Sequence, residues 1–355
     1  MKSILSHFRQ LKICNILLIL ILFVTSMSNV SARDLQSSSD EVFDLSDNQQ
    51  IVKYTMKLTS RTDGLNISIM VIMPKEDPKA VVQLSHGVCG CKERFLPFME
   101  YMARHGVVCV AGDHRGHGAS IKSDDDLGYM YEGGYMALVD DMRMITDWIH
   151  GKFPKLPVYL VGHSMGSMAA RVYVKYDDSQ IDGLIVCGSP SWNPMSRVGK
   201  FLSGMMCTFG LGRSRMSMAQ RMTSNRYNKR FASEGVQAWT CSDPEVRRQF
   251  AQTPTCNFTL TANGSYNVMC LMRETYKKDK WMVSNPELPI RFISGADDPM
   301  MLNDKKFMDA VKDICNRGYK NVTSATFPQM RHEILNEIGK EAVWDDILNF
   351  MGIND

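Results

Sequence analysis

Residues 157–166 have the sequence Pro-Val-Tyr-Leu-Val-Gly-His-Ser-Met-Gly, and this stretch decides the fold. An apolar run that suits a buried strand leads into a Gly-x-Ser-x-Gly turn, and helix-like sequence follows from Ser167 to Tyr173. At such a sharp turn, side chains at positions 162 and 166 would collide with the neighbouring backbone, which explains the two glycines. The turn lifts the Ser164 hydroxyl to a helix N-terminus, where negative charge is favoured. The pentapeptide therefore predicts that Ser164 is a nucleophile, provided that a base and an acid accompany it.

Strands and helices alternate on both sides of this turn. Polar residues 33–49 show no apolar periodicity and predict a flexible leader, and the alternation begins at residue 50. Such alternation predicts an α/β fold with a largely parallel sheet and helices on both faces. The expected strands are Val52–Leu58, Leu65–Met73, Ala80–Ser85, Val107–Ala111, the run before Ser164, Gly183–Gly188, Ile290–Ser294 and Ser324–Phe327.

The segment 189–289 interrupts this alternation. It is rich in Met and Arg and contains short helical patterns without strands. A loop of that length would be improbable, so we expect a helical cap inserted between a first core part (50–188) and a second (290–355). The apolar stretches 201–206 and 209–211 fit either the packed interior of this cap or a lid that touches acyl chains, a membrane or a micelle.

The N-terminus has the pattern of a secretory signal. Lys2, Arg9 and Lys12 precede the apolar run 16–24, and small residues end at Ala32. We therefore expect residues 1–32 to be a signal peptide that directs export, with an uncleaved membrane anchor as the alternative. Cleavage would reduce the formal charge from +3 to about zero, which argues against nucleic acid as a partner.

The number and positions of the cysteines do not determine the disulfide pairing. Without Cys14, nine cysteines remain, so at least one thiol of an exported chain is free or bonded to another molecule. Cys89-Gly90-Cys91 is too tight for an ordinary structural disulfide, and Cys109 and Cys187 suit buried strands. A bridge among the cysteines of the insertion is plausible; these are Cys207, Cys241, Cys256 and Cys270.

A serine nucleophile needs a base and an orienting acid, which in chains with this turn follow in the order Ser, Asp or Glu, His. His332 is the only histidine C-terminal to Ser164, and it follows the last predicted strand. The acid lies in Ser-Gly-Ala-Asp-Asp-Pro, residues 294–299. The usual spacing of three residues after Gly295 selects Asp298, and Asp297 is the alternative.

Two backbone N–H groups are expected to form an oxyanion hole. Met165 directly follows the nucleophile, and Val88 follows the predicted strand Ala80–Ser85 in the turn that contains Gly87. His86 is expected to brace this loop rather than to transfer protons. Residues 113–118, Asp-His-Arg-Gly-His-Gly, allow a metal site in principle, but no further ligands are apparent and a tight loop beside the active site fits better. We predict no metal and no cofactor.

Five segments together identify a family resemblance. They are His86-Gly87, residues 113–118 with Ser120, residues 162–166, Gly295-x-x-Asp298, and residues 330–337, Met-Arg-His-Glu-Ile-Leu-Asn-Glu. In combination they resemble the monoacylglycerol lipase and lysophospholipase family of α/β-hydrolases, also described as serine aminopeptidase-like, over residues 50–350. The chain departs from the family pattern at residues 89–93, which makes the loop around Val88 less typical.

The resemblance implies an α/β-hydrolase fold with a mostly parallel, eight-stranded type of sheet and a helical cap. It also implies a Ser164–Asp298–His332 triad that cleaves esters of single-acyl lipids entering under the cap. Alternatives that keep the triad are a carboxylesterase acting on short or feruloyl-type esters and a peptidase. A non-catalytic binding protein with the same fold is the alternative from another class.

Overall fold

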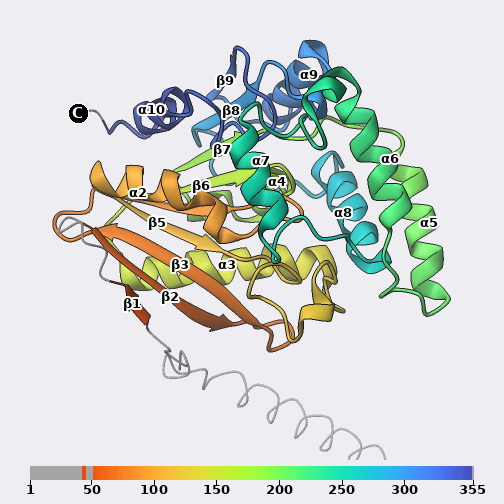
Figure 1. The fold of residues 1–355 in the computed structure, drawn as a ribbon. Helices are drawn as coiled ribbons and strands as arrows, with labels where there is room; N and C mark the ends of the chain where they lie inside the picture. The colour runs from red at the N-terminus through yellow and green to blue at the C-terminus, as the bar shows by residue number, and fades with distance from the viewer. Residues whose placement is uncertain (1–41, 45–50, 354–355) are drawn as a thin grey trace, which may run out of the picture. The chain divides into compact units, whose positions relative to one another are not determined.

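A single twisted sheet organises the described part of the chain, residues 42–44 and 51–353 of this computed structural model. The strands run in the order β1-β2-β3-β5-β4-β6-β7-β8-β9 (Figure 1). Their bounds are β1 Val42–Asp44, β2 Ile51–Thr59, β3 Asn66–Pro74, β4 Ala80–Ser85, β5 Val107–Gly112, β6 Val158–His163, β7 Gly183–Cys187, β8 Ile290–Gly295 and β9 Val322–Phe327. Strands β5, β4, β6, β7, β8 and β9 are mutually parallel, whereas β1, β2 and β3 pair antiparallel.

Strands β2 to β9 form the mostly parallel, eight-stranded sheet that the sequence predicts, and each predicted strand is present. The central strands consist of continuous apolar residues because helices bury both of their faces. Cys109 in β5 and Cys187 in β7 are fully buried, as expected for thiols in core strands.

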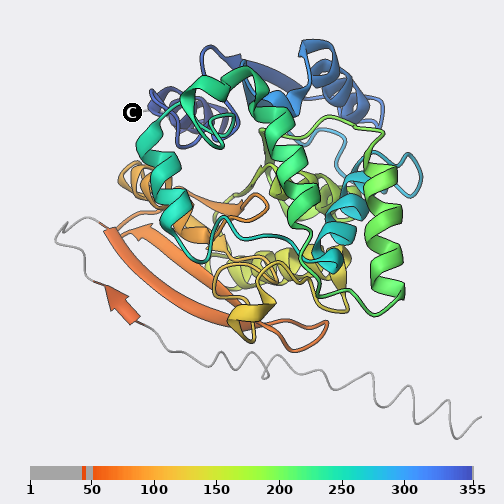
Figure 2. The same ribbon diagram turned by 45° about the vertical axis from the view of Figure 1, so that its right-hand side comes forward.

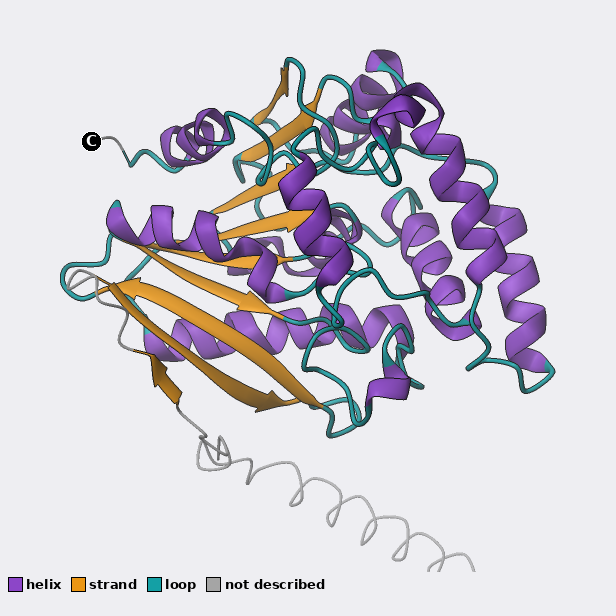
Figure 3. Ribbon diagram, viewed as in Figure 1, coloured by secondary structure: helices purple, strands orange, loops and turns teal. Residues whose placement is uncertain are grey.

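Helices cover the sheet on both sides (Figure 3). One apolar cluster joins one face of the sheet to α2 and α10, and a second joins the other face to α3, α4 and α9. These helices are α2 Leu96–Arg104, α3 Gly134–Lys152, α4 Met165–Asp177, α9 Asp304–Cys315 and α10 Glu341–Phe350. Helix α2 ends at Arg104, and Gly106 follows it with a φ of +87°.

The insertion between β7 and β8 is helical, as the sequence predicts. It contains α5 Ser196–Thr208, α6 Ser217–Asn228, α7 Pro244–Gln252 and α8 Ala262–Thr275, and its only strand-like pairing among the described residues is one bridge, Arg215 with Thr261. Figure 2 shows α5, α6 and α7 arching over one end of the molecule. By contrast, α8 packs against the core helices α3 and α4. The same helix also packs against α5, so it joins the arch to the helical layer on the sheet.

The leader differs from its prediction in one respect. Residues 42–44 are not flexible coil but form β1, which pairs with β2 at the sheet edge. Three residues are too few for a recognisable apolar alternation, and the strand gains its hydrogen bonds from the otherwise open edge of β2. The predicted signal peptide, residues 1–32, lies outside the described residues. In the portion described, no helix combines the length and apolar character needed to cross a bilayer.

Candidate active site

Ser164 occupies a strained turn between β6 and α4. Its φ of 52° and ψ of −115° lie outside the regions that L-residues ordinarily adopt. A Cβ on Gly162 would lie 2.4 Å from the carbonyl oxygen of Gly166, and a Cβ on Gly166 would lie 2.0 Å from that of Ser85. Both glycines are therefore sterically required, for the reason inferred from the sequence.

The structure brings Ser164, His332 and Asp298 into one hydrogen-bonded chain. Nε2 of His332 lies 2.8 Å from Ser164 Oγ, and Nδ1 lies 2.9 Å from Oδ2 of Asp298. The other carboxylate oxygen of Asp298 accepts a hydrogen bond from the N–H of Met300 at 2.8 Å, which fixes its orientation. Each of the three residues is only 4% exposed. The base is thus held between its proton source and a fixed negative charge.

The two adjacent aspartates point to different partners. Oδ1 of Asp297 pairs with Arg230 of the insertion at 2.6 Å, and the N–H of Asp297 donates to the carbonyl of Met330 at 2.9 Å. Only Asp298 contacts His332. The geometry therefore agrees with the three-residue spacing from Gly295 and assigns Asp297 to the cap interface.

The loop after β4 passes directly beside the nucleophile. The pairing of β4 with β6 places Ser85 opposite Gly162, and a Cβ on Gly87 would lie 3.1 Å from Cβ of Ser164. The N–H of Val88 in this loop has no acceptor within the part of the chain that the structure describes. Met165 is the first residue of α4, and the first N–H groups of a helix have no acceptor inside it. Both N–H groups predicted to bind an oxyanion are thus available near Ser164.

His86 braces this loop and is not linked to the triad. Its Nδ1 donates to the carbonyl of Gly87 at 2.7 Å, and its Nε2 accepts from the N–H of His114 at 3.0 Å. Burial lowers the pKa of His86 to about 4 and that of His117 to about 3, so both rings are neutral at pH 7.

Both carboxylate oxygens of Asp113 also have hydrogen-bond partners. They accept hydrogen bonds from the N–H and Nζ of Lys92, both at 2.7 Å, and from the N–H of Ala119 at 2.8 Å. A Cβ on Gly118 would lie 2.2 Å from Cγ of Asp113. Residues 113–118 therefore form the tight, internally bonded loop that the sequence favours over a metal site. No cluster of potential metal ligands occurs among residues 42–44 and 51–353.

The family described as serine aminopeptidase, S33, matches residues 76–339 of the chain. The chain belongs to this family of α/β-hydrolases. The match includes the elbow, both aspartates and His332, so the family resemblance inferred from the five segments is confirmed.

Lipases and esterases are among the relatives of this α/β-hydrolase. A monoacylglycerol lipase of Mycolicibacterium smegmatis is 22% identical over 290 residues, which cover 81% of this chain and 93% of the relative. The crystal structure of a carboxyl esterase from Bacillus coagulans in complex with glycerol superimposes with a TM-score of 0.78 at 24% identity, covering 85% of this chain and 98% of that one. A soluble variant of monoglyceride lipase from Saccharomyces cerevisiae in complex with a substrate analog superimposes with a TM-score of 0.63 at 18% identity, covering 81% and 92%. The chain is a serine hydrolase of the lipase and esterase type.

Electrostatics in the site of this hydrolase favour a basic His332. Burial alone would lower the pKa of His332, but the charge of Asp298 and its hydrogen bond outweigh burial and raise that pKa above its ordinary value. The neighbouring Glu333 is half-buried, and Arg94 at 2.8 Å and the nearby His163 hold its pKa well below the usual range. Two negative charges therefore support protonation of His332 when it accepts the serine proton.

His163 contributes a contact that the motif alone did not reveal. Its Nε2 donates to the carbonyl oxygen of His332 at 3.0 Å, so the residue before the nucleophile anchors the backbone of the base. This position is the variable first x of Gly-x-Ser-x-Gly, and nothing in the local pattern indicates a partner 169 residues away.

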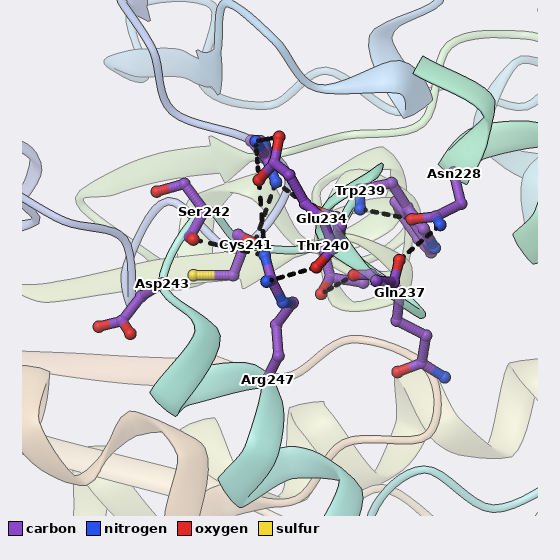
Figure 4. Close-up of polar contacts among 12 residues, drawn as sticks. Asn228, Glu234, Gln237, Trp239, Thr240, Cys241, Ser242, Asp243 and Arg247 are labelled. Carbon is purple, nitrogen blue, oxygen red and sulfur yellow. Dashed lines mark hydrogen bonds and ion pairs between the residues drawn. The ribbon is translucent and has the colours of Figure 1, made fainter. Parts of the chain in front are cut away.

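The insertion also contacts the loop that carries His332. Figure 4 shows the polar contacts of the segment concerned, including Glu234, Thr240 and Ser242. Arg331 binds both carboxylate oxygens of Glu234, at 2.7 and 2.8 Å, and donates to the carbonyl of Ala238 at 2.6 Å. Its guanidinium also lies over the ring of Phe231, 4.0 Å from the centroid. We call residues 231–243 the clamp segment.

Further contacts continue this connection beyond Arg331. The N–H of Glu333 donates to the carbonyl of Thr240 at 2.7 Å, and the N–H of Ser242 donates to Glu337 at 2.8 Å. The ring of Trp239 lies 5.3 Å from the ring of His332. The clamp segment thus contacts the base and both of its chain neighbours.

Replacing Glu234 with glutamine is expected to lower kcat/KM by about tenfold, because the bidentate, charge-assisted pair with Arg331 is lost and His332 is less firmly positioned. Glu245→Gln is the matched control, since Glu245 also pairs with an arginine of the insertion, Arg248 on α7, but does not contact Arg331. The measurement is ester hydrolysis by both variants, with thermal unfolding to establish that each is folded. Equal activity of the two variants would show that the clamp segment does not position His332.

Proposed function

We propose that this hydrolase cleaves carboxylic esters of single-acyl lipids, such as monoacylglycerols or lysophospholipids. The observation that carries ester hydrolysis is the buried hydrogen-bonded chain from Ser164 through His332 to Asp298. Relatives named monoacylglycerol lipase and monoglyceride lipase support this substrate class.

In the proposed reaction, Ser164 attacks the ester carbonyl while Nε2 of His332 takes the hydroxyl proton. Asp298 orients the imidazole and stabilises its charged form. The N–H groups of Val88 and Met165 stabilise the tetrahedral oxyanion. His332 then protonates the leaving alcohol, and a water that it activates hydrolyses the acyl-enzyme, which restores the free serine.

Burial of the triad favours an acyl substrate held away from water. Side chains of the insertion lie close to the site, with Trp239 against His332 and Arg230 against Asp297. A general esterase for short esters would use the same triad, so the chain length of the preferred acyl group separates the two functions. The intact hydrogen bonds of Ser164 and His332 disfavour a non-catalytic binding protein.

A panel of monoacylglycerols and p-nitrophenyl esters with acyl chains of increasing length tests the substrate class. We expect kcat/KM to rise as the chain lengthens, because each buried methylene contributes about 0.8 kcal/mol, or roughly fourfold. Lysophospholipids with the same acyl chains compare head groups. A maximum at acetyl or butyryl esters, with no hydrolysis of long-chain monoacylglycerols, would replace the lipid proposal by the esterase alternative.

We further propose that α5 contacts a lipid surface. Among the described residues of this helix only Ser196 and Ser203 are buried, whereas Phe201 is 64% exposed and Phe209, directly after it, is 73% exposed. An open groove of about 810 Å³ runs between α5 and α8. It is lined by apolar and basic side chains: Arg197, Lys200, Phe201, Met205, Phe209, Tyr266 and Arg273 among others. Apolar side chains flanked by cations suit the interface of an anionic bilayer.

Sedimentation with vesicles tests this contact. The double variant Phe201→Asp with Phe209→Asp is expected to bind phosphatidylcholine–phosphatidylserine vesicles at least about tenfold more weakly, because two apolar anchors become charged. Ile338→Asp is the matched control, since Ile338 is also highly exposed but lies outside the insertion. Unchanged vesicle binding by the double variant would exclude α5 as the contact. Its hydrolysis of a dissolved short ester should equal that of the wild type.

A further inference from the structure

Two cysteines far apart in the sequence meet where the insertion touches the loop after β4. Sγ of Cys91 lies 3.0 Å from Sγ of Cys256, and both residues are buried. Cys91 belongs to the core and Cys256 to the segment between α7 and α8. A disulfide requires the sulfurs to approach by about 1 Å further, which small side-chain rotations can provide.

Backbone contacts already hold the two segments together. The N–H of Asn257 donates to the carbonyl of Cys89 at 3.0 Å, one residue beyond Cys256 and two before Cys91. Within the loop after β4, the carbonyl of Cys91 accepts a hydrogen bond from the N–H of Arg94 at 3.2 Å. The hydrogen bond between Asn257 and Cys89 thus keeps Cys256 beside Cys91.

We propose that Cys91 and Cys256 form a disulfide that ties the cap to the loop carrying Val88. From the sequence, a bridge among the four cysteines of the insertion is one plausible pairing, but the sulfur that lies beside Cys256 belongs to the core. Cys89 also lies close to this pair, yet the only sulfur–sulfur contact found among the described cysteines joins Cys91 and Cys256.

The oxidant is a low-molecular-weight disulfide, such as oxidised glutathione. The thiolate of one cysteine attacks this disulfide, forms a mixed disulfide and releases one thiol. The second cysteine then attacks the sulfur of the first and releases the second thiol. Two protein thiols and one small disulfide thus become one protein disulfide and two small thiols, with the two electrons passing to the small molecule.

Burial determines when this exchange takes place. The hydrogen bond to Cys256 and burial both raise the pKa of the Cys91 thiol, so it is a poor nucleophile once the cap is docked. We therefore expect the bond to form while residues 253–257 are still undocked, during folding or cap opening. Afterwards the same burial shields the disulfide from reductants. Such a bond suits the oxidising environment that the predicted signal peptide implies.

Peptide mapping tests the pairing. The purified full chain is incubated with a mixture of reduced and oxidised glutathione, alkylated, and digested without reduction. We expect a peptide pair that joins Cys91 to Cys256 and disappears on reduction, in the wild type and in the control variant Cys315→Ala, which lacks an exposed thiol of α9. Recovery of both cysteines as alkylated thiols, or a pair that joins Cys89 to Cys256, would overturn the proposal.

Thermal unfolding provides a second readout that does not depend on catalysis. A disulfide that closes a loop of this length is expected to raise Tm by about 5 °C. The oxidised wild type and Cys315→Ala should therefore lose about 5 °C in dithiothreitol, whereas Cys256→Ala should have the same Tm with and without it. Identical values of Tm for the wild type in both conditions would contradict a bond across this interface.

Discussion

Replacing Ser164 with alanine is expected to lower ester hydrolysis by about 10⁴-fold or more, because the attacking atom is removed while the oxyanion donors remain. The fold should persist. Alanine at a φ of 52° is as strained as serine, and the substitution removes only one hydrogen bond, the one to His332. Thermal unfolding should therefore show a Tm close to that of the wild type.

Labelling with a fluorophosphonate probe gives the direct measurement. The wild type should form one covalent adduct, and Ser164→Ala should form none. Ser203→Ala is the matched control, because Ser203 is also a buried serine but bonds to the carbonyl of Gly199 in α5, away from the triad. If Ser164→Ala still reacted with the probe at the wild-type rate, the nucleophile would have to be another residue.

The elbow, the base and the core strands could be predicted because their signals are local. The glycines on either side of Ser164 respond to backbone atoms within a few residues or on the adjacent strand. His332 could be chosen because no other histidine follows Ser164 in the chain. Continuous apolar runs predicted the buried strands, since parallel strands covered on both faces need no polar alternation.

Contacts of the insertion could not be predicted, because they join residues that are far apart in the sequence. Arg331 and Glu234 are 97 residues apart, and Cys91 and Cys256 are 165 apart. Amphipathic helices indicate which of their faces is apolar but not the surface on which they dock. The clamp segment and the sulfur pair arise only when the insertion settles over the ends of β6 and β8. The contacts between the insertion and the site are therefore the part least visible in the sequence.

The assignment of Asp298 rather than the adjacent Asp297 as the acid of the triad can be tested directly. The kcat values of the two asparagine variants should differ by several orders of magnitude. Asp298→Asn is expected to lower kcat by about 10³- to 10⁴-fold, because an amide neither holds His332 in the required tautomer nor stabilises its charge. Asp297→Asn should stay within about threefold of the wild type, because its partner Arg230 is exposed and such ion pairs contribute little.

The pH profile distinguishes loss of charge from loss of structure. His332 accepts a proton only when it is neutral, so activity falls as the pH decreases through its pKa. Since Asp298 raises that pKa above 6.5, the acidic limb of the wild type and of Asp297→Asn should lie above pH 6.5. In Asp298→Asn the charge of Asp298 is lost and only Glu333 still opposes burial, so the limb of the residual activity should move to a lower pH than in the wild type. A limb that moves in Asp297→Asn instead would assign the charge beside His332 to the other carboxylate.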